Sequence, residues 1–379
     1  MEVLAKIVPD MEKPMPLTDD QKKAVREALV CKYSAEDIED ALSDIQELID
    51  AEELFAADIY KDYVIDFKKR QTVVKALCLH IAHDCNLACK YCFAEEGEYH
   101  GRRALMSFEV GKKALDFLIA NSGSRHNLEV DFFGGEPLMN WEVVKQLVEY
   151  GRSKEAEYGK KFRFTITTNG MLLDDEKMDF INKEMSNVVM SIDGRKEVND
   201  RVRKRVDGTG CYDRIVERYK RLAEKRHYQN YYVRGTFTKY NLDFSNDVFH
   251  LYDLGFDQIS VEPVVCDHNE KYALTEKELP AIFSEYERLA ELMLINEKKG
   301  KHFNFFHFML DLDQGPCAIK RLRGCGSGNE YVAITTEGEY LYAGSILSPY
   351  KMSCEMMKKR LECAIMIKAA HAEEAAEEE

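Results

Sequence analysis

Residues 73–92 read VVKALCLHIAHDCNLACKYC, an apolar stretch followed directly by three cysteines. The apolar part, VVKALCLHI (73–81), has the length and composition of a buried strand. Cys85, Cys89 and Cys92 follow it in a C-x3-C-x2-C spacing. Three thiolates on one short loop can converge on one metal centre, so this segment predicts a strand and a metal site at its end.

Five more apolar strands follow, and amphipathic helical segments separate them. We expect the further strands at 127–133, 161–168, 187–192, 231–238 and 258–265, and helices at 107–120, 140–151, 174–185, 211–225, 245–256 and 275–299. Alternating strands and helices predict a parallel sheet with right-handed crossovers. Six units are fewer than the eight of a closed barrel. The pattern therefore predicts an α/β fold, an open or partial (β/α)6 barrel with its ligand site at the carboxyl ends of the strands.

The region before the first strand is expected to be helical. Residues 18–21 (TDDQ) fit a capping box, and Ser34 can cap the helix after it. The spacing of apolar residues in this second helix predicts one buried face, with Ile38, Leu42, Ile45, Leu48 and Ile49. We divide the chain into a helical region (1–66), the barrel (67–302), a Cys- and Gly-containing region (303–369) and an acidic tail (370–379).

Composition restricts the class of protein. The 379 residues carry a net charge of −15, which argues against a protein built to bind nucleic-acid phosphates or anionic lipid. No apolar run is long enough for a transmembrane helix, and the first residues do not resemble a signal peptide. We therefore expect a cytoplasmic protein with no nucleic-acid or membrane partner. Because a reducing cytosol disfavours disulfides, the 11 cysteines make metal binding the first explanation.

The cysteine loop is compatible with several kinds of site. A [4Fe–4S] cluster normally takes four thiolates, so three would leave one iron open to a small ligand. Structural zinc more often uses two separated pairs of ligands, although His83 lies close in sequence. Three cysteines without a metal are the remaining alternative.

The loop resembles the C-x3-C-x-aromatic-C motif of the radical S-adenosylmethionine (SAM) enzymes, with Tyr91 as the aromatic residue between Cys89 and Cys92. The resemblance implies that Cys85, Cys89 and Cys92 hold a [4Fe–4S] cluster whose open iron binds SAM. It further implies that the reduced cluster cleaves SAM to methionine and a 5′-deoxyadenosyl radical, which removes a hydrogen atom from the substrate. An electron donor of the flavodoxin or ferredoxin type would then be required.

The second expected strand ends in GGEP, comprising Gly134, Gly135, Glu136 and Pro137. Paired glycines allow a close approach of the backbone to a ligand, and Pro137 favours an extended Glu136. The resemblance implies that this segment contacts the SAM ammonium group. A simple turn at the end of a strand is the alternative.

Polar residues also follow the later strands. The resemblance implies cofactor contacts from Thr168 and Asn169 in TTNG, Ser191 and Asp193 in SIDG, Arg203 and Glu262. Ser191 and Asp193 would bond to the ribose and Arg203 to the SAM carboxylate, whereas Glu262 would line the adenine or substrate pocket. The alternatives are ordinary turns and, for Arg203, a solvated side chain in a charged run.

The similarity extends over most of residues 30–369 to maturases of SCIFF peptides (six cysteines in forty-five residues), which belong to the peptide-modifying radical SAM enzymes with a C-terminal SPASM domain. It implies thioether cross-links in a Cys-rich precursor peptide whose leader binds an N-terminal winged-helix-like element. Two departures stand out: the strands of that element are missing, and so is the central cysteine block of the SPASM region, where Ala343 stands instead of an expected ligand. Cys317, Cys325 and Cys354 resemble its outer ligands, and with Cys363 they could hold one auxiliary cluster or none.

Two other functions remain compatible with the sequence. One is a different radical modification of a polypeptide, such as formylglycine formation in a sulfatase. The other is a degenerate, non-catalytic iron–sulfur scaffold, which the two departures support. Against the scaffold, each motif expected around the SAM site is present at its strand end.

Overall fold

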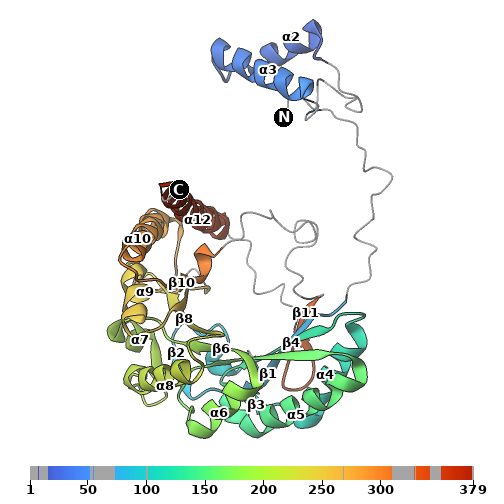
Figure 1. Ribbon diagram of the computed structural model, residues 1–379, viewed down its shortest axis with the longest axis vertical. Helices are drawn as coiled ribbons and strands as arrows, with labels where there is room; N and C mark the ends of the chain where they lie inside the picture. The colour runs from blue at the N-terminus through green and yellow to red at the C-terminus, as the bar shows by residue number, and fades with distance from the viewer. Residues whose placement is uncertain are drawn as a thin grey trace. The chain divides into compact units, whose positions relative to one another are not determined.

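The computed structural model describes residues 7, 16–51, 54, 73–99, 101–267, 269–309, 328, 330–341 and 351–377. The chain divides into two compact units, Met1–Arg70 and Gln71–Glu379 (Figure 1). Among the described residues, no helix combines the length and the apolar character needed to span a bilayer.

The smaller unit contains two capped helices, α2 (Asp19–Leu29) and α3 (Ala35–Asp50). Both predicted caps are confirmed, because the Thr18 and Ser34 hydroxyls each accept a backbone N–H from the first helical turn. The small apolar core of the unit contains Leu17, Val25, Ile38, Leu42 and Ile49. The prediction that Leu48 is buried is wrong, since its side chain is 41% exposed. Consecutive helical residues point about 100° apart, so the inward direction of Ile49 leaves Leu48 outside.

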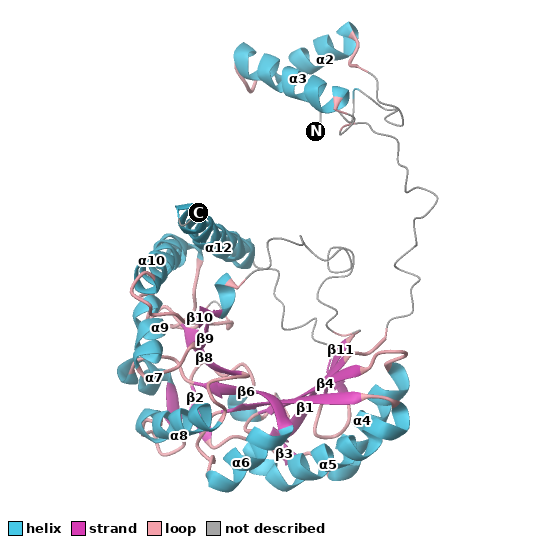
Figure 2. Cartoon of the chain, in the orientation of Figure 1, coloured by secondary structure: helices cyan, strands magenta, loops and turns pink. Residues whose placement is uncertain are grey.

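The larger unit is built on the six expected strands, which pair in parallel and in chain order. These strands are β1 (Ala76–His83), β4 (Asn127–Gly134), β5 (Lys161–Thr168), β6 (Met185–Ser191), β8 (Tyr231–Phe237) and β9 (Gln258–Pro263). The expected helices are α4 (Phe108–Asn121), α5 (Trp141–Tyr158), α6 (Asp175–Glu184), α8 (Tyr212–Lys225), α9 (Phe244–Asp253) and α10 (Leu279–Glu297). The sheet curves with helices along its convex side (Figure 2), and its two edge strands do not pair with each other. The predicted partial barrel is confirmed.

Short strands that the sequence analysis did not anticipate extend this sheet at both edges. One lies parallel to β1 and another lies parallel to β9, while two pair in antiparallel fashion. They are β3 (Ala104–Leu105), β10 (Asn304–Phe305), β11 (Tyr331–Ile334) and β12 (Tyr340–Leu341). Two to four residues carry too little periodicity to predict a strand. The last helix, α12 (Lys351–Glu377), packs against α10 and the single-turn helix η5 (Phe306–Phe308).

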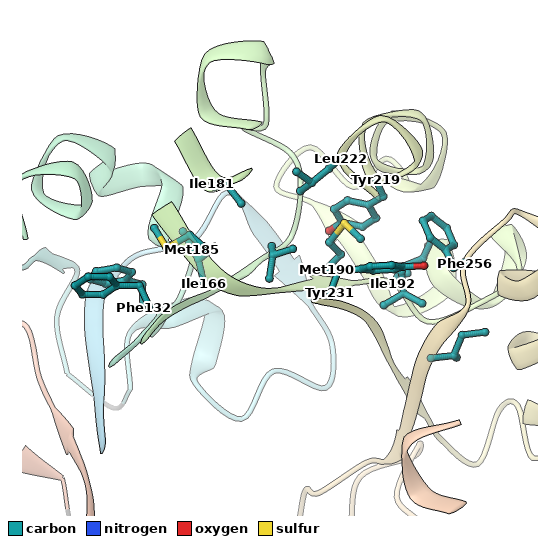
Figure 3. Packing of buried hydrophobic residues seen from close by; sticks show 14 of the residues in the cluster. Phe132, Ile166, Ile181, Met185, Met190, Ile192, Tyr219, Leu222, Tyr231 and Phe256 are labelled. Atoms are coloured by element: carbon teal, nitrogen blue, oxygen red, sulfur yellow. The ribbon is translucent and has the colours of Figure 1, made fainter. Parts of the chain in front are cut away.

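Alternate residues of the strands face opposite sides of the sheet. The outer side packs on the helices and forms the apolar core, part of which Figure 3 shows around Phe132, Ile166 and Tyr231. The other side, here called the inner face, is the concave side of the sheet in Figure 2. Its side chains are mainly polar and include Asp131, Arg163, Thr165, Asn187, Arg234, Ser260 and Glu262. A polar inner face opposite an apolar core predicts that ligands bind on the concave side.

Phe164 tests the packing of the outer side. Its ring is fully buried and stacks between Phe132 and Phe162, with centroid separations of 5.5 and 5.6 Å. We expect Phe164→Ala to lower the free energy of unfolding by about 3–5 kcal/mol, because removal of the ring leaves a cavity that the packed sheet and helices cannot close. Urea unfolding monitored by circular dichroism measures this change. Tyr158→Ala, at a half-exposed position on α5, should cost far less, and equal losses would contradict this account.

Candidate functional site

The three cysteines lie on the loop that leaves the carboxyl end of β1. Cys89 ends the short strand β2 (Leu87–Cys89), which pairs antiparallel with β7 (Arg203–Arg205). The Cys92 N–H donates to the Cys89 carbonyl at 3.0 Å, so the loop turns back on itself. The Cys85 sulfur accepts the Leu87 N–H at 3.4 Å. All three thiols are partly buried, and the loop is fixed by backbone bonds on both sides.

The protonation of these thiols fits a metal site. Burial raises the pKa of Cys85 to about 11 and that of Cys89 to about 12. Both groups are therefore neutral thiols at pH 7 in the metal-free chain, and a bound metal would be the charge that converts them to thiolates. In a four-iron cluster each thiolate binds a different iron, so the sulfur atoms need not converge on one point. No group of side chains in the described part of the chain is arranged around a single metal ion.

His83 has other partners, which removes the support for the zinc alternative. Its Nε2 lies 3.1 Å from His80 Nδ1, and its Nδ1 lies 3.4 Å from the Thr336 hydroxyl. The ring of Tyr99 stacks on His83 with centroids 4.8 Å apart, and its hydroxyl donates to the Gly134 carbonyl. This cluster is not evident from the sequence, because strict alternation puts residues 80 and 83 on opposite faces. An irregularity in the β1–β4 pairing between His80 and Ala82 changes the register.

The paired glycines bring the end of β4 against the end of β1. Gly134 has φ +119°, and a Cβ atom there would lie 2.3 Å from the Ala82 carbonyl oxygen. A Cβ atom on Gly135 would lie 2.1 Å from the backbone carbonyl oxygen of Asp84. The Gly135 N–H donates to Ala82 at 2.7 Å, which closes this contact next to Cys85. The glycines are thus required by an approach within the chain, and a contact with the SAM ammonium group stays a prediction.

Glu136 connects the ends of β4 and β5. It is extended, as its position before Pro137 predicted, and its carboxylate is fully buried. That carboxylate accepts the Thr168 hydroxyl at 2.8 Å and the Asn169 N–H at 2.7 Å. Asn169 in turn donates from Nδ2 to Asn86 at 2.7 Å, inside the cysteine loop. The motifs that follow β4 and β5 therefore form one continuous series of hydrogen bonds that ends at the cysteine loop.

Asp193, Tyr91 and Arg203 form a second buried network. The Tyr91 hydroxyl donates to the Asp193 carboxylate at 2.9 Å and accepts from Arg203 Nη1 at 3.0 Å. The Thr236 N–H donates to the same carboxylate at 3.0 Å. Arg203 is only 7% exposed, so the alternative of a solvated arginine is wrong. Its Nε is buried without a hydrogen-bond partner, which a ligand carboxylate could supply.

The other predicted site residues are placed as follows. Ser191 ends β6, and its carbonyl accepts the Tyr219 hydroxyl at 3.2 Å. Glu262 lies on β9, where its carboxylate contacts His307 at 3.3 Å. Cys317, Cys325 and Ala343 fall outside the described residues, as does the side chain of Cys354. Cys363 is buried in the apolar core on α12.

Tyr91→Phe tests the Asp193 network. The change removes one donor from a buried carboxylate, so we expect the free energy of unfolding to fall by about 1–3 kcal/mol. Chemical denaturation measures this loss. Tyr150→Phe is the matched control, because the Tyr150 hydroxyl donates to the more accessible Asp116, where water can replace it. A loss in Tyr91→Phe no larger than that in the control would contradict a structural role for the buried network.

Glu136→Gln tests the electrostatics of its carboxyl group. Burial raises the pKa of Glu136 from 4.5 to about 7, against the opposing hydrogen bonds from Asn169, Leu138 and Thr168. Because the folded-state pKa is the higher one, its stabilising contribution is complete below pH 4.5 and is lost as the pH rises through about 7. The unfolding free energy of Glu136→Gln relative to wild type should therefore increase from pH 5 to pH 7.5. Glu149→Gln, at an exposed position, provides the baseline, and parallel profiles for the two variants would contradict the shift.

Comparison with known proteins identifies the domain that carries this site. Residues 79–239 match the sequence model of the Radical SAM superfamily. The chain is similar to the radical SAM cyclopropyl synthase TigE of Paramaledivibacter caminithermalis, with 27% identity over 45% of this chain and 38% of that protein. It is also similar to the serine-type anaerobic sulfatase-maturating enzyme of Bacteroides thetaiotaomicron, with 28% identity over 48% of this chain and 44% of that protein. The matched region thus spans about two fifths of the length of these relatives.

A solved structure shows the same fold. Native anSMEcpe with bound AdoMet and Cp18Cys peptide aligns with a TM-score of 0.59 and 19% identity, over 76% of this chain and 80% of that one. The cofactors of the superfamily are a [4Fe–4S] cluster and SAM, and three thiols beside an unpartnered buried guanidinium fit both. Residues 79–239 of this chain therefore form a domain that is similar in sequence and in fold to the radical SAM enzymes.

Proposed function

We propose that this chain is a radical SAM enzyme that modifies a ribosomally made peptide, and that the modification joins a cysteine sulfur to a carbon of another residue. The observation that carries the proposal is the cysteine loop at the carboxyl edge of the sheet, held by β1, β2 and β7. When bound, the reduced cluster and SAM supply a radical that removes a hydrogen atom from the substrate. The chain's own residues hold these groups and orient the peptide.

Each element of the site has a proposed role. Cys85, Cys89 and Cys92 would hold the cluster, and Arg203 would bind the SAM carboxylate through its unpartnered Nε. Asp193 keeps Tyr91 against Arg203 and so fixes the direction of that guanidinium. A one-electron donor of the flavodoxin or ferredoxin type, and a cytoplasmic location, complete the proposal.

The inner face supports a peptide as the substrate. It presents hydroxyl, carboxylate and guanidinium groups along neighbouring strands, which suits the many polar groups of a peptide backbone. Among the similar proteins, the name of one refers to sulfatase maturation, and anSMEcpe was solved with the Cp18Cys peptide. We propose that residues 1–66 recognise the precursor and that residues 303–369 hold one auxiliary cluster through Cys317, Cys325 and Cys354.

The name of the Bacteroides relative refers to sulfatase maturation, which favours a second candidate reaction, formylglycine formation in a sulfatase. In both reactions the substrate loses hydrogen, and the two products differ chemically. A thioether lowers the peptide mass by two hydrogens and removes a thiol that iodoacetamide would alkylate. Formylglycine contains an aldehyde that reacts with a hydrazide, so mass spectrometry of the treated peptide separates the two.

Cys89→Ala tests whether the loop generates the radical. After anaerobic reconstitution with iron, sulfide, SAM and a strong reductant, wild-type protein should bind about four iron atoms at the loop and release 5′-deoxyadenosine. Cys89→Ala should release none, because the remaining two thiolates cannot hold the cluster. Cys31→Ala, which changes an exposed cysteine far from the loop in sequence, should behave as wild type. Release of 5′-deoxyadenosine by Cys89→Ala would refute the assignment. If wild-type protein binds iron but releases no 5′-deoxyadenosine, the scaffold alternative would be favoured.

A further inference from the structure

Arg234 differs from the other charged groups on the inner face. Arg163 on β5 pairs with Glu129 on β4 at 3.3 Å, and Asp131 accepts the Tyr331 hydroxyl at 2.8 Å. Arg234 lies in the middle of β8 with an exposed side chain, and its guanidinium has no hydrogen bond or ion pair with another described residue. A guanidinium on the ligand-facing side of a sheet is therefore free to bind an anion.

A second guanidinium reaches the same region from α12. Arg360 donates from Nε to the Tyr286 hydroxyl at 2.9 Å, which fixes the direction of the side chain. Its Nη2 is buried without a hydrogen-bond partner and lies 3.9 Å from the Glu262 carboxylate, too far for a hydrogen bond. This donor, like Arg234, lacks an acceptor in the described part of the chain.

The Glu262 carboxylate interacts electrostatically with both guanidinium groups, and its hydrogen bonds come from other residues. Glu262 Oε1 accepts the Ser260 hydroxyl at 3.2 Å and contacts His307 Nε2 at 3.3 Å. Burial lowers the pKa of His307, which keeps its imidazole neutral at pH 7. Ser260 is the register partner of Arg234 on the neighbouring strand, and Glu262 follows two residues later on the same face of that strand. Two guanidinium groups against one carboxylate leave a net charge of +1 in a chain whose overall charge is −15.

The position of this cluster relates it to the reaction site. Thr236, which follows Arg234 on the same face of β8, donates its N–H to Asp193 in the buried network. On the other side of Arg234, Tyr232 packs edge-on against Phe306 at 5.7 Å, and the Phe306 ring is half exposed. A substrate on the inner face would meet an apolar ring, then the guanidinium groups, and then the cofactor site.

We propose that Arg234 and Arg360 form a subsite that binds a carboxylate of the peptide substrate, either an Asp or Glu side chain or the C-terminal carboxylate. The proposal rests on the proposed function, since it requires a peptide on the inner face. Planar guanidinium groups bind carboxylates through paired, charge-assisted hydrogen bonds, and carboxylates are the anions that an unmodified peptide offers. The negative charge of the chain as a whole disfavours acidic ligands, so preference for them requires a local positive site.

Affinity selection from peptide mixtures tests the subsite. Immobilised reconstituted protein with SAM is exposed to two randomised mixtures of short N-acetylated peptides, one ending in an amide and one in a free acid, and mass spectrometry identifies the retained peptides. Wild type should enrich Asp and Glu in the amide mixture if the ligand is a side chain, or retain the free-acid mixture preferentially if it is the C-terminus. Arg234→Gln should lower the enrichment about tenfold, equivalent to about 1.4 kcal/mol. Arg234→Lys should restore part of it.

Arg163→Gln is the matched control, because it removes an inner-face guanidinium that already has a carboxylate partner. It should keep the acidic preference, and all variants should still release 5′-deoxyadenosine without peptide. Peptide retention without a preference for carboxylates, or a preference that persists in Arg234→Gln, would overturn the subsite alone. If no peptide is retained above the level of denatured protein, both the peptide substrate and the subsite would be overturned. If wild type releases no 5′-deoxyadenosine, the proposed radical chemistry itself would be overturned.

Discussion

The buried carboxylate of Asp193 is the constraint on which the site depends. Burial raises the pKa of this group to about 6, so its charged form requires compensation. The compensation comes from the Tyr91 hydroxyl in the cysteine loop and from the Thr236 N–H on β8. Arg203 completes the network through Tyr91 and lies in register with Cys89. One charge thus connects the cysteine loop to three separate segments of the chain, and the loop cannot move without removing the Tyr91 hydrogen bond from that carboxylate.

Much of the fold could be predicted because strong local patterns agree with the global architecture. The outer residues of β5, Phe162, Phe164 and Ile166, are buried, whereas Arg163 and Thr165 between them face the inner side. This alternation, together with the helix between each pair of strands, determines a parallel sheet. The edges could not be predicted in the same way. β11 pairs with β1 across about 250 residues of sequence, and the four residues of β11 are too few to predict which distant strand they pair with.

The site shows the same division between local and distant information. The spacing of Cys85, Cys89 and Cys92 is enough to predict a candidate metal site at the end of the first strand. The extended backbone of Glu136 follows from the proline after it, Pro137. The burial of Arg203 does not follow from its sequence context, because a run rich in Lys and Arg usually indicates a solvated surface. Pairing with β2 draws this residue inside. The partners of Glu262 were equally hidden, since His307 and Arg360 come from elements far along the chain.

Unsatisfied polar atoms have an uneven distribution in this molecule. Four buried side-chain atoms in the described residues lack a hydrogen-bond partner, and one of them, Trp141 Nε1, belongs to a helix on the outer side. The other three are Asn187 Oδ1 on the inner face of β6, Arg203 Nε beside the cysteine loop, and Arg360 Nη2. Each such atom costs about 1–3 kcal/mol when it has no partner. A bound ligand that supplied hydrogen-bond partners to these atoms would recover part of that cost. The unpartnered atoms, which destabilise the ligand-free protein, would then contribute directly to the affinity for the ligand and to its orientation. The inner face and the residues next to it therefore combine incomplete hydrogen bonding with open polar surface, the combination expected where substrate and cofactor complete the structure.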